Sequence, residues 1–515
     1  MLKDSAEFTV KINAKATLIM TNKMKLILYL ILSLLVTYMP TFTFAQYLDN
    51  TFGAGGQVNT SLGSFGNMCN SVVIQDDQKI VFGGTAKSSD FSDYNFAIAR
   101  CNIDGTLDTT FGTGGKVVTP IEPGSEGNSV AIQSNGKILL GGSSGWFINL
   151  VRYNSDGSLD TTFGTGGKVI TDIDGYYNEK CKSVAIQSDG KILLGGYGQH
   201  NSSDVPYFIL VRYNTNGTLD TSFGTDGKVI GRIGYGRSLL IQDDGKILLG
   251  GGSNFTFALA RYNADGILDT TFGVGGEVIT AVGSSSEGNS LGIQSDGTIV
   301  LGGYADNNFA LVRYNIDGSL DNTFGLGGKV TTVIGSYSAG KSIGIQNDGK
   351  IVLGGYAEAD FALVRYNSDG TLDNTFGNGG KIITPIGVVY NPGNSLDIQN
   401  DGKIVMGGDA YNGDMALVRY NSALVGIGKT DSKLFVSKIY PNPFNSVVTI
   451  QFNKPLDNAE LMICNIFGQE VKKITNFSGQ EIQLFRNNLL SGIYFLGIKE
   501  EFKIITLEKL VISDN

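Results

Sequence analysis

Three short motifs recur seven times along the chain, and this repetition constrains the fold more than any other feature. The motif Leu-Asp-x-(Thr/Ser)-Phe-Gly has its Phe at positions 52, 111, 163, 223, 272, 324 and 376. A second motif, of the type Ile-Gln-x-(Asp/Asn)-Gly-Lys-Ile, begins at 74, 132, 186, 241, 293, 345 and 398. A third, Phe-Ala-Leu-Val-Arg-Tyr-Asn, has its Arg at 100, 152, 212, 261, 313, 365 and 419. Repeats of about 49 to 60 residues are typical of solenoids and propellers.

Each repeat contains four strand signals. In the sixth repeat, runs rich in apolar residues at 342–346, 350–353 and 361–367 alternate with Asp-Gly turns, and a fourth run lies within residues 372–384. Asp-Gly between alternating apolar runs predicts a β-hairpin, because Gly accepts the positive φ that such turns need. Two hairpins per repeat form a four-stranded meander, which is one blade of a propeller. An open β-solenoid is the alternative.

The order of the motifs at the two ends favours a closed ring. A lone copy of the fourth strand, residues 48–58, precedes the first complete repeat, whereas the last repeat, residues 395–421, lacks this strand. The N-terminal strand is therefore expected to complete the C-terminal blade, which hides the edges of the ring. The sequence thus predicts an all-β protein with a seven-bladed β-propeller of four-stranded blades.

Composition agrees with this fold and excludes several classes of function. The chain has 72 Gly, only 9 Pro and 17% charged residues, which indicates many tight turns rather than disorder. A net charge of −9 disfavours nucleic-acid binding, which needs clustered Lys and Arg. One His, at position 200, and four Cys without a CxxC pair leave little basis for a triad, a zinc site or a disulfide framework. Residues 154–160 resemble half a calcium loop, but Arg152 and Phe163 occupy two of its ligand positions. No metal or cofactor is predicted.

One Arg and one Asp recur in every repeat and are predicted to form structural ion pairs. Strand alternation places Phe309, Leu311 and Arg313 on one face, so the Arg head is desolvated and needs a partner. A carboxylate is the natural partner, and the last pair is expected to form across the ring closure. A ring of anion sites is the functional alternative. The residues are Arg100, Arg152, Arg212, Arg261, Arg313, Arg365 and Arg419, with Asp49, Asp108, Asp160, Asp220, Asp269, Asp321 and Asp373.

The connections after the second and fourth strands of each repeat vary, and both lie on one rim of a propeller. Between the Gly-Gly pair and the third-strand Phe there are 11 residues in the first and third repeats, 85–95 and 197–207, but four in the second, 143–146. Insertions on one face often mark the binding face, and aromatic residues with carboxylates suit a sugar or peptide surface. Ordinary loop residues are the alternative. The candidate ligand-binding rim contains Phe91, Asp93, Tyr94, Trp146, Asp172, Tyr176, Tyr177, His200, Asp204 and Tyr207.

Asp397 is the one charge expected in the central channel at the third position of the first strand of each repeat. Hydrolytic glycosidases normally use two placed carboxylates, and no second one occurs at this position. No catalytic residue is assigned. The sequence therefore favours a role without catalysis, and an enzyme that acts on polysaccharide is kept as the alternative.

The three motifs together give the chain a family resemblance over about residues 47–422. This region resembles the delta-60 repeat family, which is also described as a β-propeller repeat of unknown function. The resemblance implies a propeller and brings no known chemistry.

The N-terminus has the pattern of a secretory signal peptide. Lys23 and Lys25 precede an apolar stretch at 26–36, and small residues lie just before Gln46. Cleavage is expected between Ala45 and Gln46, and Met24 is a candidate for the true start. A transmembrane anchor is the alternative, because the apolar stretch can be extended to about 20 residues.

A different type of sequence follows residue 433. Alternation at 447–452 predicts antiparallel strands of a small Ig-like β-sandwich, and the Pro-Asn-Pro run suits a turn. The motifs of residues 434–515 resemble, in their order, the type A sorting domain of the type IX secretion system. The resemblance implies export through the periplasm and the outer membrane, followed by release or surface attachment. An ordinary terminal Ig-like domain is the alternative. The motif residues are Pro441, Asn442, Pro443, Gly468, Gly492, Tyr494 and Lys509.

The sequence thus predicts four segments: a leader at 1–45, a propeller at 46–421, a linker at 422–433 and a sorting domain at 434–515. The expected protein is a secreted or cell-surface binding module without a transmembrane span in its mature form. Its expected partners are the secretion machinery and an unknown extracellular glycan or protein. A polysaccharide-acting enzyme and a purely structural surface repeat protein are the alternatives.

Overall fold

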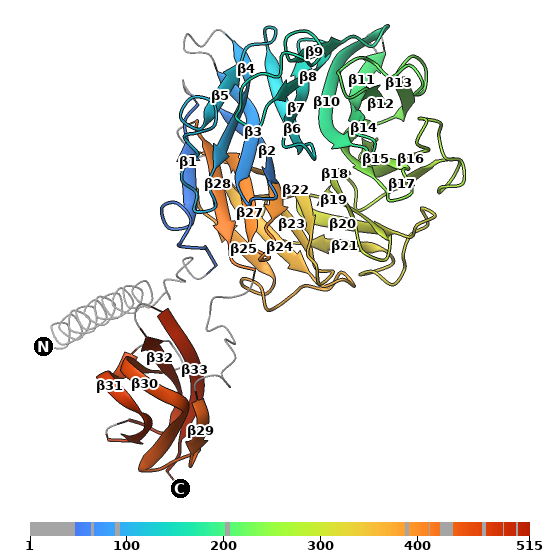
Figure 1. The fold of residues 1–515 in the computed structure, drawn as a ribbon. Helices are drawn as coiled ribbons and strands as arrows, with labels where there is room; N and C mark the ends of the chain where they lie inside the picture. The colour runs from blue at the N-terminus through green and yellow to red at the C-terminus, as the bar shows by residue number, and fades with distance from the viewer. Residues whose placement is uncertain are drawn as a thin grey trace, which may run out of the picture. The chain divides into compact units, whose positions relative to one another are not determined.

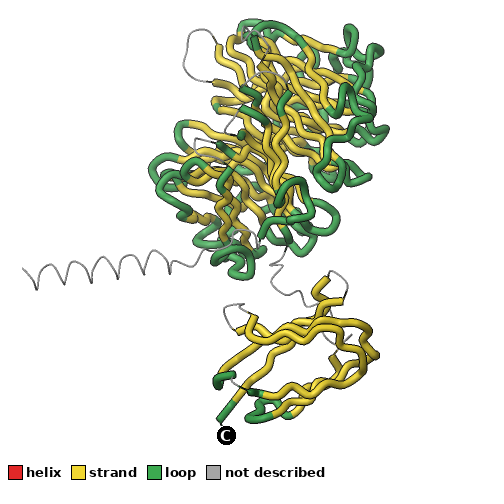
Figure 2. Tube along the Cα trace, turned by 90° about the vertical axis from the view of Figure 1, so that its left-hand side faces the viewer, coloured by secondary structure: helices red, strands yellow, loops and turns green. Residues whose placement is uncertain are grey.

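The computed structural model describes residues 47–62, 66–87, 93–200, 206–386, 391–410, 413–422, 436–465, 470–487, 489–500 and 503–514. Within these ranges the chain forms strands, turns and loops and no helix (Figure 2). The predicted cleavage site at Ala45 and Gln46 lies outside the described residues, as do Phe91, Asp204 and Gly468.

Seven four-stranded antiparallel sheets form the blades of a propeller (Figure 1), which confirms the predicted fold class. We name the strands of each blade a to d from the channel outward. Blade 1 contains β2 (Met68–Ile74), β3 (Ile80–Lys87), β4 (Tyr94–Cys101) and β5 (Lys116–Thr119). Blade 2 contains β6 (Ser125–Ile132), β7 (Ile138–Ser144), β8 (Phe147–Tyr153) and β9 (Lys168–Thr171). Blade 3 contains β10 (Tyr176–Ile186), β11 (Ile192–His200), β12 (Pro206–Tyr213) and β13 (Lys228–Ile233).

The remaining blades have the same order. Blade 4 contains β14 (Tyr235–Ile241), β15 (Ile247–Ser253), β16 (Thr256–Tyr262) and β17 (Glu277–Thr280). Blade 5 contains β18 (Ser286–Ile293), β19 (Ile299–Ala305), β20 (Asn308–Tyr314) and β21 (Lys329–Thr332). Blade 6 contains β22 (Ser338–Ile345), β23 (Ile351–Ala357), β24 (Asp360–Tyr366) and β25 (Lys381–Thr384). Blade 7 contains β26 (Gly393–Ile398), β27 (Ile404–Asp409), β28 (Met415–Tyr420) and, from the N-terminal end of the described chain, β1 (Gln57–Thr60).

Blade 7 closes the ring with the N-terminal strand. The d strand β1 pairs antiparallel with β28, with Val58 opposite Leu417. The d strands are shorter than the sequence predicts. The Phe-Gly-x-Gly-Gly segment forms a turn and does not pair with a neighbouring strand. In blade 6 this turn contains Gly377, Gly379 and Gly380, which have φ values of 58°, 60° and 88°, before β25 begins at Lys381.

A ring of seven Ser hydroxyls joins neighbouring a strands. In each blade a backbone N–H donates to the Ser Oγ of the preceding blade at 3.0–3.1 Å, and Val72 donating to Ser395 completes the circle. The second Gly of each strand b lies beside a strand a bulge. A Cβ there would lie 1.8–2.1 Å from a carbonyl oxygen of strand a, or in blade 7 of Pro392 just before it, so this position requires Gly.

The C-terminal region forms one five-stranded antiparallel sheet with its own apolar core. The order is β29-β30-β32-β33, and β31 also pairs with β30. The long β30 pairs with β29 through its first half and with β32 through its second half. The pairing of β30 with β31 contains several register shifts. One bulged sheet therefore surrounds the apolar core, where the sequence predicts the two sheets of a small sandwich. The strands are β29 (Val436–Tyr440), β30 (Val447–Asn465), β31 (Glu470–Phe485), β32 (Gly492–Glu500) and β33 (Lys503–Ile512).

Candidate functional site

The propeller has two rims that differ in sequence and in contacts. The constant rim consists of the a–b and c–d turns of all blades. The variable rim consists of the b–c connections and of the d–a connections between blades. Strand a begins at the variable rim and ends at the constant rim, so residues early in each a strand lie near the mouth of the channel on the variable rim.

On the constant rim, each repeated Arg contacts the repeated Asp of its own blade. The closest nitrogen–oxygen distance is 2.7–2.8 Å in all seven pairs, and every Arg and Asp of the set is buried. The guanidinium lies 4.1–4.6 Å from the centroid of the Phe ring of the Phe-Gly motif. Arg419 pairs with Asp49 across the closure of the ring.

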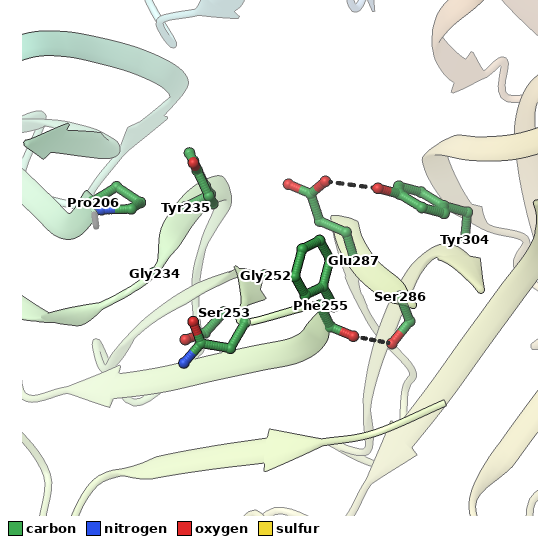
Figure 3. Close-up of a pocket in the computed structure, with 10 residues that line it drawn as sticks. Pro206, Gly234, Tyr235, Gly252, Ser253, Phe255, Ser286, Glu287 and Tyr304 are labelled. Carbon is green, nitrogen blue, oxygen red and sulfur yellow. Dashed lines mark hydrogen bonds between the residues drawn. The ribbon is translucent and has the colours of Figure 1, made fainter. Parts of the chain in front are cut away.

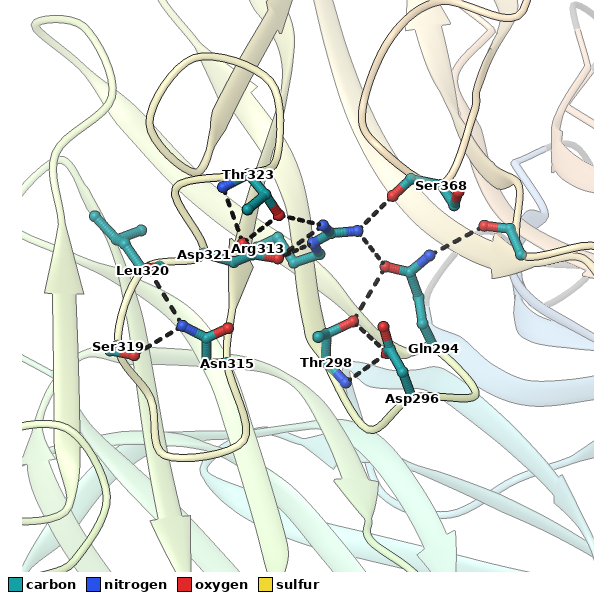
Figure 4. A network of polar contacts seen from close by, with 11 residues as sticks. Gln294, Asp296, Thr298, Arg313, Asn315, Ser319, Leu320, Asp321, Thr323 and Ser368 are labelled. Atoms are coloured by element: carbon teal, nitrogen blue, oxygen red, sulfur yellow. Dashed lines mark hydrogen bonds and ion pairs between the residues drawn. The ribbon is translucent and has the colours of Figure 1, made fainter.

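Each of these Arg residues also reaches the next blade. Arg313 Nη1 donates to the Ser368 carbonyl of blade 6, as Figure 4 shows, and the other six make the equivalent contact. Burial by itself raises the pKa of each Asp, but hydrogen bonds from Thr or Ser and the nearby Arg charge lower it below its usual value overall. The network links the blades and leaves no Arg head open to solvent.

On the variable rim, five of the predicted rim residues form two groups of contacting rings, which lie on neighbouring parts of the rim between blades 2 and 3. Trp146 makes an edge contact with Tyr177, with ring centroids 5.9 Å apart. Tyr176 makes edge contacts with His200 at 5.2 Å and Tyr207 at 5.8 Å. We call these five residues the rim aromatic cluster. Trp146 is 62% exposed and Tyr177 is 47% exposed.

Four members of the rim aromatic cluster lie on strands, although the sequence places them in loops. Tyr176 pairs with His200 between β10 and β11, and Tyr207 pairs with Gly198 between β11 and β12. Extending the sheet gives these backbone groups ladder partners that a loop would not supply. The inserted residues therefore lengthen blade 3 and hold the rings on a rigid scaffold.

The other predicted residues lie elsewhere. The Asp93 carboxylate accepts the backbone N–H groups of Tyr94 and Gly124 in blades 1 and 2. The Asp172 carbonyl accepts Lys228 Nζ at 2.7 Å. Asp397 accepts the N–H of Ile74 at 2.8 Å across the ring closure, and burial raises its pKa. The contacts of Asp397 are thus with backbone at the junction of blades 7 and 1.

A second group of polar and aromatic residues lies at the mouth of the channel and was missed by the sequence analysis. We call it the channel-mouth cluster. The signal that identifies it is the residue before the ring Ser, which is Asn in four repeats and a cation in blades 3, 4 and 6. The cluster consists of Glu126, Lys180, Lys182, Tyr197, Tyr235, Arg237, Glu287, Tyr304, Lys341 and Tyr356.

Contacts across blades hold the channel-mouth cluster together. Arg237 of blade 4 contacts Glu287 Oε1 of blade 5 at 2.8 Å, and the Tyr304 hydroxyl donates to Glu287 Oε2 at 3.2 Å. The rings of Tyr197 and Tyr235 lie 5.0 Å apart, with the Arg237 guanidinium about 5.5 Å from each. Arg237 of blade 4 thus contacts residues of blades 3 and 5.

Beside Glu287 the variable rim has a cavity of about 240 Å³ (Figure 3). Tyr235, Glu287 and Tyr304 line it on the channel side, and Phe255, which is 76% exposed, also lines it. This volume is below the ~300–1,000 Å³ of pockets for drug-sized ligands, so it suits one ring of a larger ligand. Among the residues that the structure describes, no three His, Cys, Asp or Glu side chains gather as a metal site would require.

The motif residues of the C-terminal sheet dock its first turn onto its last strand. The Asn442 side chain donates to the Lys509 carbonyl and accepts the Val511 N–H, both at 2.7 Å. The Tyr494 hydroxyl donates to the Leu490 carbonyl at 2.9 Å. Pro441 and Pro443 flank Asn442 in this turn, and Gly492 begins β32.

Comparisons with known proteins agree with both regions. The family described as "Domain of unknown function (DUF5122) beta-propeller" matches residues 75–111, 133–163, 187–223, 242–272, 294–324, 346–376 and 399–423. The family described as "Secretion system C-terminal sorting domain" matches residues 438–513. No curated protein matches the chain in sequence.

Solved structures resemble the chain distantly. Virginiamycin B lyase from Staphylococcus aureus is 10% identical with a TM-score of 0.41, covering 71% of this chain and 99% of its own. PorZ, a surface component of the type-IX secretion system of Porphyromonas gingivalis, is 10% identical with a TM-score of 0.30, covering 86% and 69%. At these scores the likenesses carry no argument about function. None of the described residues belongs to a helix that could cross a membrane.

Proposed function

Because this chain is built of DUF5122 β-propeller repeats and a secretion system C-terminal sorting domain, we propose that its propeller is an extracellular binding module. The sorting domain marks a protein exported by the type IX secretion system, which is secreted or attached to the cell surface. The proposed ligand site is the variable rim around the rim aromatic cluster. The proposed ligand is an extracellular glycan or protein.

The contrast between the two rims carries this proposal. On the constant rim, the repeated charges are buried and engaged in the same way in all seven blades. On the variable rim, Trp146 and Tyr177 are large, exposed and absent from the repeat pattern, so the architecture does not require them. Rigid aromatic rings give large contact areas at low entropic cost, which is why they are common in binding surfaces.

The enzyme alternative has less support. A polysaccharide hydrolase needs two carboxylates that converge on the substrate. At the channel mouth, Glu287 is engaged by Arg237 and by Tyr304, and Glu126 lies 3.6 Å from Lys180. Both carboxylates therefore have partners already.

The test is an array of extracellular glycans and peptides probed with the full mature chain. We expect a Trp146→Ala/Tyr177→Ala double variant to bind the wild-type ligand at least about tenfold more weakly, equal to about 1.4 kcal/mol. Leu326→Ala is the matched control, because Leu326 is 89% exposed but lies in a c–d turn of the constant rim. Unchanged affinity of the double variant would place the site elsewhere. Absence of any ligand would favour a structural surface protein.

A further inference from the structure

The channel-mouth cluster occupies a position where most blades carry an uncharged residue. In blades 1, 2, 5 and 7 an Asn before the ring Ser donates to a carbonyl of the next blade. These bonds run from Asn70, Asn128, Asn289 and Asn394 at 2.8–3.0 Å. Blades 3, 4 and 6 place Lys182, Arg237 and Lys341 there instead. A blade can therefore form with Asn at this position. The propeller fold does not require the three cations.

Lys182, Arg237 and Lys341 occupy the same position of strand a in blades 3, 4 and 6, directly before the ring Ser, so all three lie near the variable rim at the mouth of the channel. Burial lowers the pKa of Lys182 to about 8, and the charge of Arg237 contributes to this shift. Burial also lowers the pKa of Lys341, and Arg237 contributes again. Burial and the charge of Arg237 thus both disfavour the ammonium forms of Lys182 and Lys341, and a bound anion would offset this repulsion.

Positive charge is in excess at this mouth. Arg237 is paired with Glu287, and Lys180 lies near Glu126. Lys182 Nζ donates to the Asn128 amide oxygen at 3.3 Å. Among the described residues, no carboxylate oxygen lies within ion-pair distance of Lys182 or Lys341. In blade 7, Asp409 directly follows the Gly-Gly pair of strand b, where blades 3, 5 and 6 have Tyr, and its carboxylate accepts the Cys69 N–H.

Tyrosine rings lie beside two of these three cations, Arg237 and Lys341. Tyr197 and Tyr235 flank Arg237, and the ring centroid of Tyr356 lies 5.7 Å from Lys341 Nζ. Tyr304 and Tyr235 also line the 240 Å³ cavity beside the channel. Flat rings pack against the C–H faces of sugars, whereas hydroxyl and carboxylate groups such as those of Tyr304 and Glu287 can bind sugar hydroxyls.

We propose that the channel mouth binds an acidic oligosaccharide, with its carboxylate or sulfate groups held by Lys182, Arg237 and Lys341. The cations neutralise the ligand, the tyrosines pack against its rings, and the cavity holds one sugar residue. This inference rests on the proposed function only in that the propeller binds an extracellular ligand. The residues of this site are not those of the rim aromatic cluster. The variants that test the two proposals are therefore different, and either proposal can be contradicted while the other stands.

The test is calorimetric titration of the full mature chain with oligogalacturonate, oligomannuronate and chondroitin sulfate. We expect at least one of them to bind, and Lys182→Asn/Lys341→Asn to weaken its affinity at least tenfold. These substitutions introduce the residue that four other blades already carry, so an unchanged thermal midpoint is expected. Lys329→Asn removes the same charge from the outer strand β21 and is the matched control.

Three further measurements decide the chemistry. Methyl esterification of a bound uronate should weaken binding at least tenfold, because it removes the negative charge but keeps the sugar rings. Affinity should fall as pH rises through about 8, where the Lys182 ammonium is lost. Polyglutamate that binds as tightly as the best saccharide would overturn the inference in favour of an acidic peptide. No binding to any of the three saccharides, or equal binding by the double variant, would also overturn it.

Discussion

In five blades a buried Tyr hydroxyl from strand c contacts a Thr hydroxyl in the d strand of the preceding blade at 2.6–2.9 Å. The other two blades break this pattern. Blade 1 has Cys101 in place of Tyr, and the Thr60 hydroxyl is buried without a partner among the described residues. Blade 4 keeps Tyr262, but Gly231 replaces the Thr, and the Tyr262 hydroxyl is likewise unpartnered there. Thr332 and Thr60 thus occupy equivalent positions in the d strands of their blades, but only the Thr332 hydroxyl has a Tyr hydroxyl as its hydrogen-bond partner.

This difference predicts unequal effects of one substitution. Thr332→Val leaves the Tyr366 hydroxyl buried without its partner and should reduce the free energy of unfolding by about 1–3 kcal/mol. Thr60→Val removes a hydroxyl that has no partner among the described residues and should change the free energy of unfolding by less than about 0.5 kcal/mol, or stabilise the protein. Urea unfolding followed by circular dichroism measures both. Equal losses from the two variants would contradict the assignment.

At the scale of elements, β10 shows how one blade departs from the repeat. It has 11 residues and contains a register shift between Tyr177 and Lys180. The extra residues turn Glu179 inward, where it is fully buried and accepts the Ile173 N–H at 2.8 Å. Burial raises the pKa of Glu179 to about 8, so the folded protein holds this carboxyl protonated at neutral pH. The register shift in β10 therefore places the Glu179 carboxyl in the interior of the protein.

The raised pKa predicts a pH dependence of stability. The unfolded chain releases the Glu179 proton near pH 4.5 and the folded chain near 8, so this residue's contribution to stability falls as pH rises between these values. Glu179→Gln cannot ionise, so its urea midpoint relative to wild type should be higher at pH 8.5 than at pH 5. Glu122→Gln, in the exposed connection before β6, is the control and should show no such trend. A constant difference between Glu179→Gln and wild type at both pH values would contradict the buried acid.

For the whole molecule, contacts between blades form two complete rings. The ring Ser hydroxyls join the a strands, and the Arg residues of the constant rim join each blade to the next c–d turn. Both rings close between blades 7 and 1, and β1 completes blade 7 by pairing with residues more than 350 positions away in the sequence. The C-terminal sheet shares no strand with the propeller and has its own core. Folding of the propeller and sorting of the chain can therefore be tested apart.

Deleting residues 434–515 should separate export from folding. We expect the truncated chain to keep the far-ultraviolet circular dichroism of a β protein and to accumulate in the periplasm, because it lacks the sorting signal. Cell fractionation and accessibility to added protease measure its location, with the full chain as the control. Surface levels of the truncated chain equal to those of the full chain would refute the role of the sorting domain.

Much of the architecture followed from the sequence because it depends on neighbouring residues. Asp-Gly turns and alternating apolar runs encode hairpins locally, and their order at the ends encodes the closure through β1. The assignment of Tyr176 and Tyr207 to loops was wrong, because strand ends depend on whether a partner strand is available. Sheet pairing, rather than local preference, decided these positions.

The sequence by itself determined the repeat, the number of blades, the export signal in the C-terminal region and the pairing of each Arg with an Asp of its own blade, including Arg419 with Asp49 across the ring closure. Only the tertiary structure decided which residues of different blades meet. Lys182, Arg237 and Lys341 are more than 50 positions apart from one another, and each looks like an isolated departure from the repeat. The ring brings their a strands to one channel mouth, where we propose that the three cations bind one acidic ligand.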